Sequence, residues 1–95
     1  MHAAVNNFVS GKVALAVGQT VHVEASNISE TTRLVDDLAL GRFGRLKLAI
    51  YLEEVFDLEL PDEALEKFIT VADIVDYVGR RYFRNIELSI PVATA

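Results

Sequence analysis

The sequence predicts an all-α domain with four helices. Three stretches carry apolar residues at helical spacing, and a turn that contains a proline separates two of them. The 95 residues can bury one core but are too few for two. With 52% apolar residues, the chain belongs with folding sequences rather than disordered ones. We therefore expect one small helical domain.

The first expected helix covers residues 5–21. Its apolar positions recur every three or four residues, as on one buried helical face. These positions are Val5, Phe8, Val9, Val13, Val17 and Val21. Residues 13–23 also fit a β-hairpin, because β-branched residues alternate on both sides of Gly18 and Gln19. The pattern favours the helix and leaves the hairpin open.

A polar stretch at residues 24–32 is rich in Ser, Asn and Thr, which favour turns. We expect Ile28 and Leu34 to anchor this loop in the core, since a long loop without apolar anchors would be mobile.

The second helix is expected to begin between Gly41 and Arg45 and to end near Asp57. One of its faces suits the core because apolar residues recur at i, i+4, i+7 and i+8. That face consists of Leu48, Leu52, Val55 and Phe56. A second face mixes apolar and charged residues. It consists of Phe43, Leu46, Lys47, Ile50 and Glu54.

The C-terminal third predicts two more helices. Pro61 ends the preceding element, and a short helix is expected over residues 62–67. Thr70 suits the N-cap of the last helix, with Asp73 three residues later as in a capping box. That helix should run from residue 71 to about 82. Its inward positions are Val71, Ile74, Val75 and Val78.

Beyond Arg84 the apolar residues alternate with a period of two. This pattern resembles an edge strand or an extended arm, but the usual behaviour of chain termini favours a frayed tail. We therefore divide the chain into a helical domain at residues 1–83 and a tail at residues 84–95. The arginines Arg80, Arg81 and Arg84 are expected near the C-terminal end of the last helix, where they complement its dipole.

Two segments resemble the acyl carrier protein family. Residues 51–78, YLEEVFDLELPDEALEKFITVADIVDYV, are similar to the second half of such a protein, and residues 28–38, ISETTRLVDDL, are similar to its loop before the modification site. The resemblance covers roughly residues 5–83. It implies a four-helix bundle whose second helix begins at the serine of an Asp-Ser-Leu triplet. In the family, that serine carries a phosphopantetheine arm with its acyl group.

Gly41, Arg42 and Phe43 occupy the triplet in this chain. Attachment of the arm needs a hydroxyl oxygen, and a guanidinium that stays protonated cannot replace it. We therefore expect no phosphopantetheine on this chain and no other cofactor.

The charge on the second helix also departs from the family. Carrier proteins usually present acids on its first turns to basic partners, whereas here Arg42, Arg45 and Lys47 come first and acids return at Glu53 and Glu54. A partner selected for an acidic face would be repelled. The predicted partner-binding residues are Arg42, Phe43, Arg45, Leu46, Lys47, Ile50, Glu53 and Glu54.

Composition argues against several other classes of protein. The net charge of −5 disfavours nucleic acid, and the lack of cysteine removes thiol chemistry. No leader pattern or long apolar run is present, so we expect a cytoplasmic protein with no membrane span. His2 and His22 lack the companion spacing of metal ligands. The carboxylates lack a proton relay, so we expect no enzyme activity.

Two functions follow as hypotheses. The first is an acyl-carrier-protein-like protein that acts by protein contact in fatty-acid, lipid or polyketide-type acyl metabolism. Its partner would be an acyl-processing enzyme or a second copy in a homodimer. The alternative is a non-covalent binder of a fatty acyl chain or acyl-CoA, in which Arg42 and Arg45 hold the acidic head group.

Overall fold

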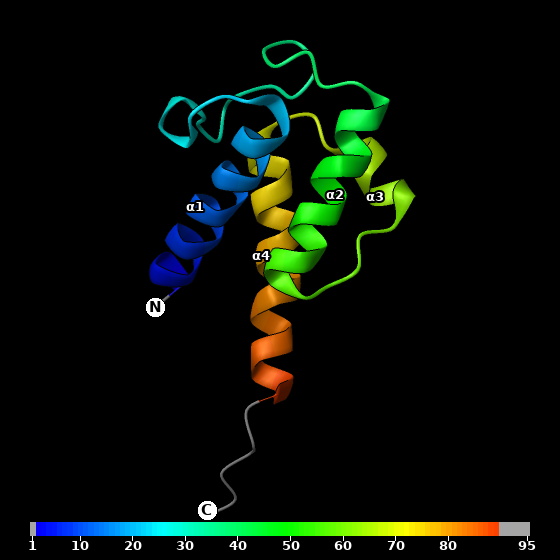
Figure 1. The fold of residues 1–95 in the computed structure, drawn as a ribbon. Helices are drawn as coiled ribbons and strands as arrows, with labels where there is room; N and C mark the ends of the chain where they lie inside the picture. The colour runs from blue at the N-terminus through cyan, green and yellow to red at the C-terminus, as the bar shows by residue number, and fades with distance from the viewer. Residues whose placement is uncertain (1, 90–95) are drawn as a thin grey trace, which may run out of the picture.

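The computed structural model describes the backbone of residues 2–89 and the side chains of residues 8–82. Over this part of the chain the structure is helical and contains no strand, which confirms the all-α prediction (Figure 1). The elements are α1 (His2–Val21), the 3₁₀ turn η1 (Ala25–Asn27), α2 (Arg42–Phe56), α3 (Asp62–Lys67) and α4 (Val71–Ser89).

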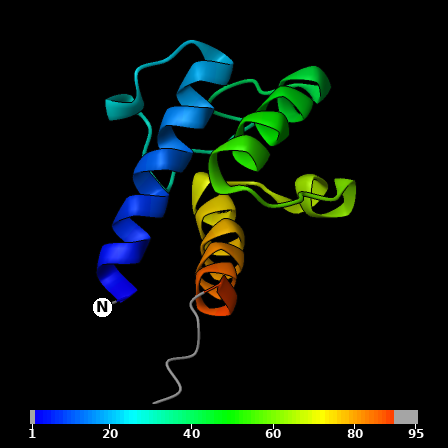
Figure 2. The same cartoon turned by 60° about the horizontal axis from the view of Figure 1, so that its bottom comes forward.

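The three long helices enclose one core. Helix α1 packs against both α2 and α4, while the short α3 lies on the side of α2 that faces away from α1 (Figures 1 and 2). Each long helix contributes side chains that are almost fully buried, because removal of apolar surface from water drives the association. They include Val9, Val13 and Val17 from α1, Leu48 and Leu52 from α2, and Ile74 and Val78 from α4.

Helix α1 resolves the choice between helix and hairpin in favour of the helix. Its stripe of Val9, Val13 and Val17 is fully buried, which a hairpin turning at residue 18 would break. Gly18 lies inside the helix, where an added Cβ would collide with the backbone carbonyl of Val23. The glycine therefore allows the chain to fold back closely after α1.

The long connection between α1 and α2 is anchored along its middle. Ile28 and Leu34 are buried, as expected of its anchors. The Leu34 amide donates to the Ile69 carbonyl over 2.8 Å, and the Val71 amide donates to the Thr32 carbonyl over 3.0 Å. These bonds pair the loop with the start of α4. The loop is therefore fixed by residues that lie far from it in the sequence.

Helix α2 has the expected bounds and buries most of the expected stripe. Leu48, Leu52 and Phe56 are at most 2% exposed. Val55 is 47% exposed, so its assignment to the core was wrong. Ala49 takes the fourth core position, because the neighbouring helices cover the side of α2 on which it lies. The helix ends at Asp57 in a left-handed conformation.

The junction of α3 and α4 matches the prediction closely. Helix α3 spans the expected residues 62–67. Thr70 and Asp73 form the predicted capping box: the Asp73 amide donates to Thr70 Oγ1 over 3.3 Å, and the Thr70 amide donates to Asp73 Oδ2 over 3.0 Å. Asp73 Oδ2 also accepts from the Ile69 amide at 2.8 Å. All four predicted inward positions of α4 are buried.

Helix α4 is longer than the sequence predicts. It reaches Ser89 instead of ending near Tyr82, so both the frayed tail favoured after Arg84 and the alternative extended arm are wrong for residues 84–89. The sequence contains no proline between Thr70 and Pro91 that would break the helix. Adding residues to an existing helix is favourable once the first turn has formed, so the alternating run continues α4. Residues 90–95 of the expected tail lie outside the described residues. Figures 1 and 2 show α4 running past the end of α2.

The greater length of α4 changes the role of its arginines. Arg80 and Arg81 lie in mid-helix rather than in the last turn. Arg80 pairs with Asp76 over 3.2 Å, and the Arg81 guanidinium lies over the Tyr77 ring at 4.5 Å. These are local contacts on the surface of the helix. The expected interaction with the helix end is therefore wrong for these two residues.

Candidate functional site

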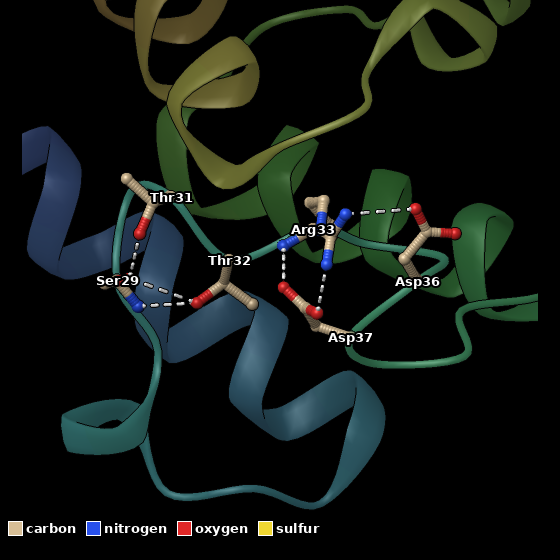
Figure 3. A network of polar contacts seen from close by, with 6 residues as sticks. All are labelled: Ser29, Thr31, Thr32, Arg33, Asp36 and Asp37. Carbon is tan, nitrogen blue, oxygen red and sulfur yellow. Dashed lines mark hydrogen bonds and ion pairs between the residues drawn. The ribbon is translucent and has the colours of Figure 1, made fainter.

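The loop that leads into α2 is shaped by its own short polar side chains (Figure 3). The Ser29 hydroxyl lies 2.9 Å from Thr31 Oγ1 and 3.2 Å from Thr32 Oγ1. The Ser29 amide donates to Thr32 Oγ1 over 2.9 Å. Hydroxyl groups that bond to a nearby backbone favour turns over regular structure. The contacts fix the bend that brings the chain to Arg33.

Arg33 and Asp37 close the next turn of this loop (Figure 3). Asp37 Oδ2 accepts from the Arg33 backbone amide at 2.8 Å, and Asp37 Oδ1 accepts from the guanidinium at 3.3 Å. The backbone bond, followed by the side-chain bond, lowers the pKa of Asp37. Asp36 lies 3.6 Å from the same guanidinium. All three side chains are exposed, so the pairs set the shape of the loop more than they stabilise the fold.

Helix α2 begins without a side-chain cap. Ala39 is left-handed, with φ of 54°, and the Leu40 amide then donates to the Leu34 carbonyl over 2.9 Å. Gly41 is the N-cap residue, and its carbonyl accepts from the Arg45 amide at 2.9 Å. Arg42 is therefore the first residue of α2, and its side chain is exposed.

The two arginines at this end of α2 have different surroundings. Arg42 is exposed, whereas Arg45 is half-buried and donates from Nη1 to the Leu65 carbonyl over 3.3 Å. Leu65 lies in α3, so the Arg45 bond ties the two helices together. Arg45 therefore has a structural role that Arg42 lacks.

A groove of ≈ 540 Å³ separates the start of α2 from α3. It is lined by Leu40, Gly41, Arg42, Arg45, Leu46, Asp62, Leu65 and Glu66. A second hollow of ≈ 210 Å³ lies beside it. This one is lined by Arg33, Val35, Asp36, Arg45, Glu66, Phe68 and Ile69. Arg45 and Glu66 line both, so the two hollows meet at this pair.

An exposed row of side chains runs along α2 opposite the core, and we call it the α2 stripe. It consists of Phe43, Leu46, Lys47, Ile50 and Glu54. Phe43 is 83% exposed, Leu46 48% and Ile50 55%. The stripe therefore presents three large apolar side chains together with one charge of each sign. An apolar row of this kind marks a surface suited to contact with another molecule.

The eight predicted partner-binding residues divide into three groups. Five of them form the α2 stripe, and Arg42 lies at its N-terminal end. Arg45 and Glu53 are half-buried and point to backbone partners instead. Arg45 bonds to α3, and Glu53 Oε2 accepts from the Leu60 amide at 2.9 Å. The sequence missed the groove residues Leu65 and Glu66, because no pattern along the chain indicates that α3 packs beside the start of α2.

No candidate metal site is found among the described residues. No group of three or more His, Asp or Glu side chains there is arranged to hold a metal ion. A search against models of known protein families finds no match for the chain. In the described part of the chain, no helix combines the length and apolar character needed to cross a membrane.

Proposed function

We propose that this chain is an acyl-carrier-protein-like domain that takes no phosphopantetheine arm. It acts by protein contact in fatty-acid, lipid or polyketide-type acyl metabolism. The observation that carries the proposal is the surface of α2, where an arginine is the first helical residue and an exposed apolar row follows. The order of the four helices supports it, because it is the order that the sequence resemblance implies.

The arm requires a hydroxyl at the start of α2. Arg42 stands at that position in the alignment of motifs, and a guanidinium offers only donors and no nucleophilic oxygen. The nearest serines and threonines along the chain, such as Thr32, lie in the loop before α2. The chain therefore has no hydroxyl for the family's acyl carriage where α2 begins.

Protein contact is favoured by the composition of the α2 stripe. Exposed aromatic and aliphatic side chains gain free energy when a partner removes them from water, at about 25 cal/mol per Å² of apolar surface. Aromatic residues often contribute most to such interfaces. Phe43, at 83% exposed, can lose more surface than any other large apolar residue among those described. We therefore assign it the central role in partner binding.

Modification of the intact chain tests the absence of the arm. The chain is incubated with coenzyme A and a broad-specificity phosphopantetheinyl transferase, and its intact mass is measured. We expect no gain for the natural chain. A matched variant with Gly41→Asp, Arg42→Ser and Phe43→Leu restores the family triplet and should gain one arm. An arm on the natural chain would contradict the proposal, and failure of the restored variant would contradict the alignment with the family.

Binding to an acyl-processing enzyme tests the protein-contact part. The immobilised chain is exposed to extract from its own source, and retained proteins are identified by mass spectrometry. We expect an enzyme of acyl metabolism to be retained, and Phe43→Asp should abolish its retention. Leu15→Asp is the matched control, because Leu15 is 50% exposed on α1. If no such enzyme is retained, or if both variants behave alike, the proposed contact is wrong.

The groove supports a second candidate function, the binding of a fatty acyl chain or acyl-CoA. Its walls combine leucines with Arg42 and Arg45, which suits a molecule with an apolar chain and an acidic head group. Asp62 and Glu66 also line it and oppose an anion, so this function ranks second. Native mass spectrometry with added palmitate should show a complex that Arg42→Ala weakens. Arg80→Ala, outside the groove, is the control.

A further inference from the structure

The α2 stripe carries its charges in a definite order. Lys47 lies about one turn before Ile50, and Glu54 lies about one turn after it. Among the described residues the ion pairs involve only the guanidinium groups of Arg33 and Arg80, so Lys47 and Glu54 make none there. The stripe therefore presents a positive charge on one side of an exposed isoleucine and a negative charge on the other.

We propose that two copies of this chain pair through their α2 stripes, with the helices antiparallel about a two-fold axis beside Ile50. A two-fold axis makes the same surface meet itself. Residues that lie equally far from the axis on opposite sides then face each other. Lys47 of each copy faces Glu54 of the other, and the two Ile50 side chains meet at the axis.

Charge complementarity selects this arrangement. Parallel helices in register would place Lys47 beside Lys47 and Glu54 beside Glu54, so both pairs would repel. The antiparallel arrangement makes both pairs attractive. It also points the dipoles of the two helices in opposite directions, which is favourable. It is therefore the self-pairing that the charges of the stripe favour.

The apolar residues of the stripe fit the same arrangement. Phe43 lies seven residues before Ile50, so its ring reaches the second copy near the turn that follows α2. Leu58 in that turn is half-buried and packs against the edge of its own core. Phe43 would cover this edge, and Leu46 would lie beside the carbon stem of Glu54. Three exposed apolar side chains of each copy thus leave water together.

The inference rests on the proposed function in one respect, because it uses the same stripe. Failure of the two proposals can be told apart, because the dimer is tested by oligomeric state and the missing phosphopantetheine arm by intact mass. A dimer would bury Phe43 and Ile50, so an enzyme and a second copy would compete for α2. Dissociation of the dimer would then control access to the stripe.

Charge reversal provides a sharp experiment. The full chain is studied by sedimentation velocity from micromolar to millimolar concentration, alone and in mixtures. The natural chain should dimerise. Lys47→Glu and Glu54→Lys should each weaken self-association by at least about tenfold, because each variant replaces two attractive pairs with two repulsive ones. An equal mixture of the two should dimerise again, because both contacts in the mixed dimer are attractive.

Control variants carry the same charge changes away from α2. Lys12→Glu lies on α1, where the ammonium sits over the Phe8 ring, and Glu24→Lys lies in the loop after α1. Neither should alter self-association by more than about twofold, since distant exposed charges are screened. High salt should reduce the effects of the α2 variants.

Two outcomes would overturn the proposal. A natural chain that stays monomeric at millimolar concentration would leave the stripe to another partner. A dimer that tolerates both α2 charge variants equally well would place the contact on another surface. Recovery in the mixture also shows that the variants are folded, because unfolded chains would not associate with this charge dependence.

Discussion

The starts of α2 and α4 use opposite solutions to the same problem. Each helix begins with backbone amides that have no partner within the helix. At α4, Thr70 and Asp73 satisfy these groups, and an acid stands in the first turn. At α2, Gly41 provides no side chain, and the first turn contains arginines and no acid.

The start of α2 lacks the stabilising groups that the start of α4 has. Positive charge at a helix N-terminus is unfavourable, and an N-cap glycine gives up the side-chain bond that Asp or Ser would make. The start of α4 is arranged for stability, whereas the start of α2 lies beside an exposed stripe and a groove. The start of α4 is therefore anchored by its own side chains, and the proposed binding surface lies beside the start of α2, where no side-chain cap is present.

The largest effect is expected from loss of the α4 cap. Asp73→Ala removes the acceptor for the amides of Ile69 and Thr70, so the free energy of unfolding should fall by about 1 kcal/mol. Urea unfolding monitored by circular dichroism measures it. Asp76→Ala is the matched control on the same helix, because it loses only an exposed ion pair worth about 0.3 kcal/mol. Equal losses of unfolding free energy in the two variants would contradict the capping role of Asp73.

Acidification should remove the same stabilisation. Backbone amides of Thr70 and Ile69 donate to Asp73 and lower its pKa from the ordinary value of 3.8. The unfolded chain then binds this proton more readily, so the stabilisation is complete above about pH 3.8 and is lost as the pH falls through the folded pKa. The stability difference between the natural chain and Asp73→Asn should therefore narrow in acid. Glu24→Gln, which removes a carboxylate from an exposed loop, serves as the control. If the stability difference for Asp73→Asn stays constant as the pH falls, the ionised carboxylate of Asp73 is not what stabilises the fold.

A smaller effect of opposite sign is expected at α2. Arg42→Glu replaces a charge that opposes the helix dipole with one that favours it, so stability should rise by about 0.5 kcal/mol at low salt. Arg42→Gln should give roughly half of this gain. Thermal unfolding at two salt concentrations measures both changes. A loss of stability in either variant would show that the Arg42 side chain makes a stabilising contact.

The smallest effect is expected at Gly44. Replacement of a helical glycine by alanine usually stabilises by about 1 kcal/mol, but a Cβ here would lie 2.7 Å from Leu40 Cδ1, whose side chain would have to move. Gly44→Ala should therefore be nearly neutral. Gly11→Ala on α1 has open space and should show the usual gain. Chemical unfolding of the two variants side by side tests this, and equal gains would mean that Leu40 adapts freely.

The helical fold was largely predictable because its signals are local. Pro61 marks the boundary before α3, and Thr70 with Asp73 marks the start of α4, each within a few residues. The end of α4 was not predictable, since alternating residues after Arg84 fit a strand as well as a helix. Val55 was misassigned because helical spacing alone does not say how wide the buried face is.

The sequence by itself determined where most helices begin and how α4 is capped. These features depend on neighbouring residues and their hydrogen bonds. Only the tertiary structure decided that Arg45 is tied to α3 and that Val55 stays exposed. The reason is that exposure depends on which distant segments pack against a face, and no local pattern contains that information.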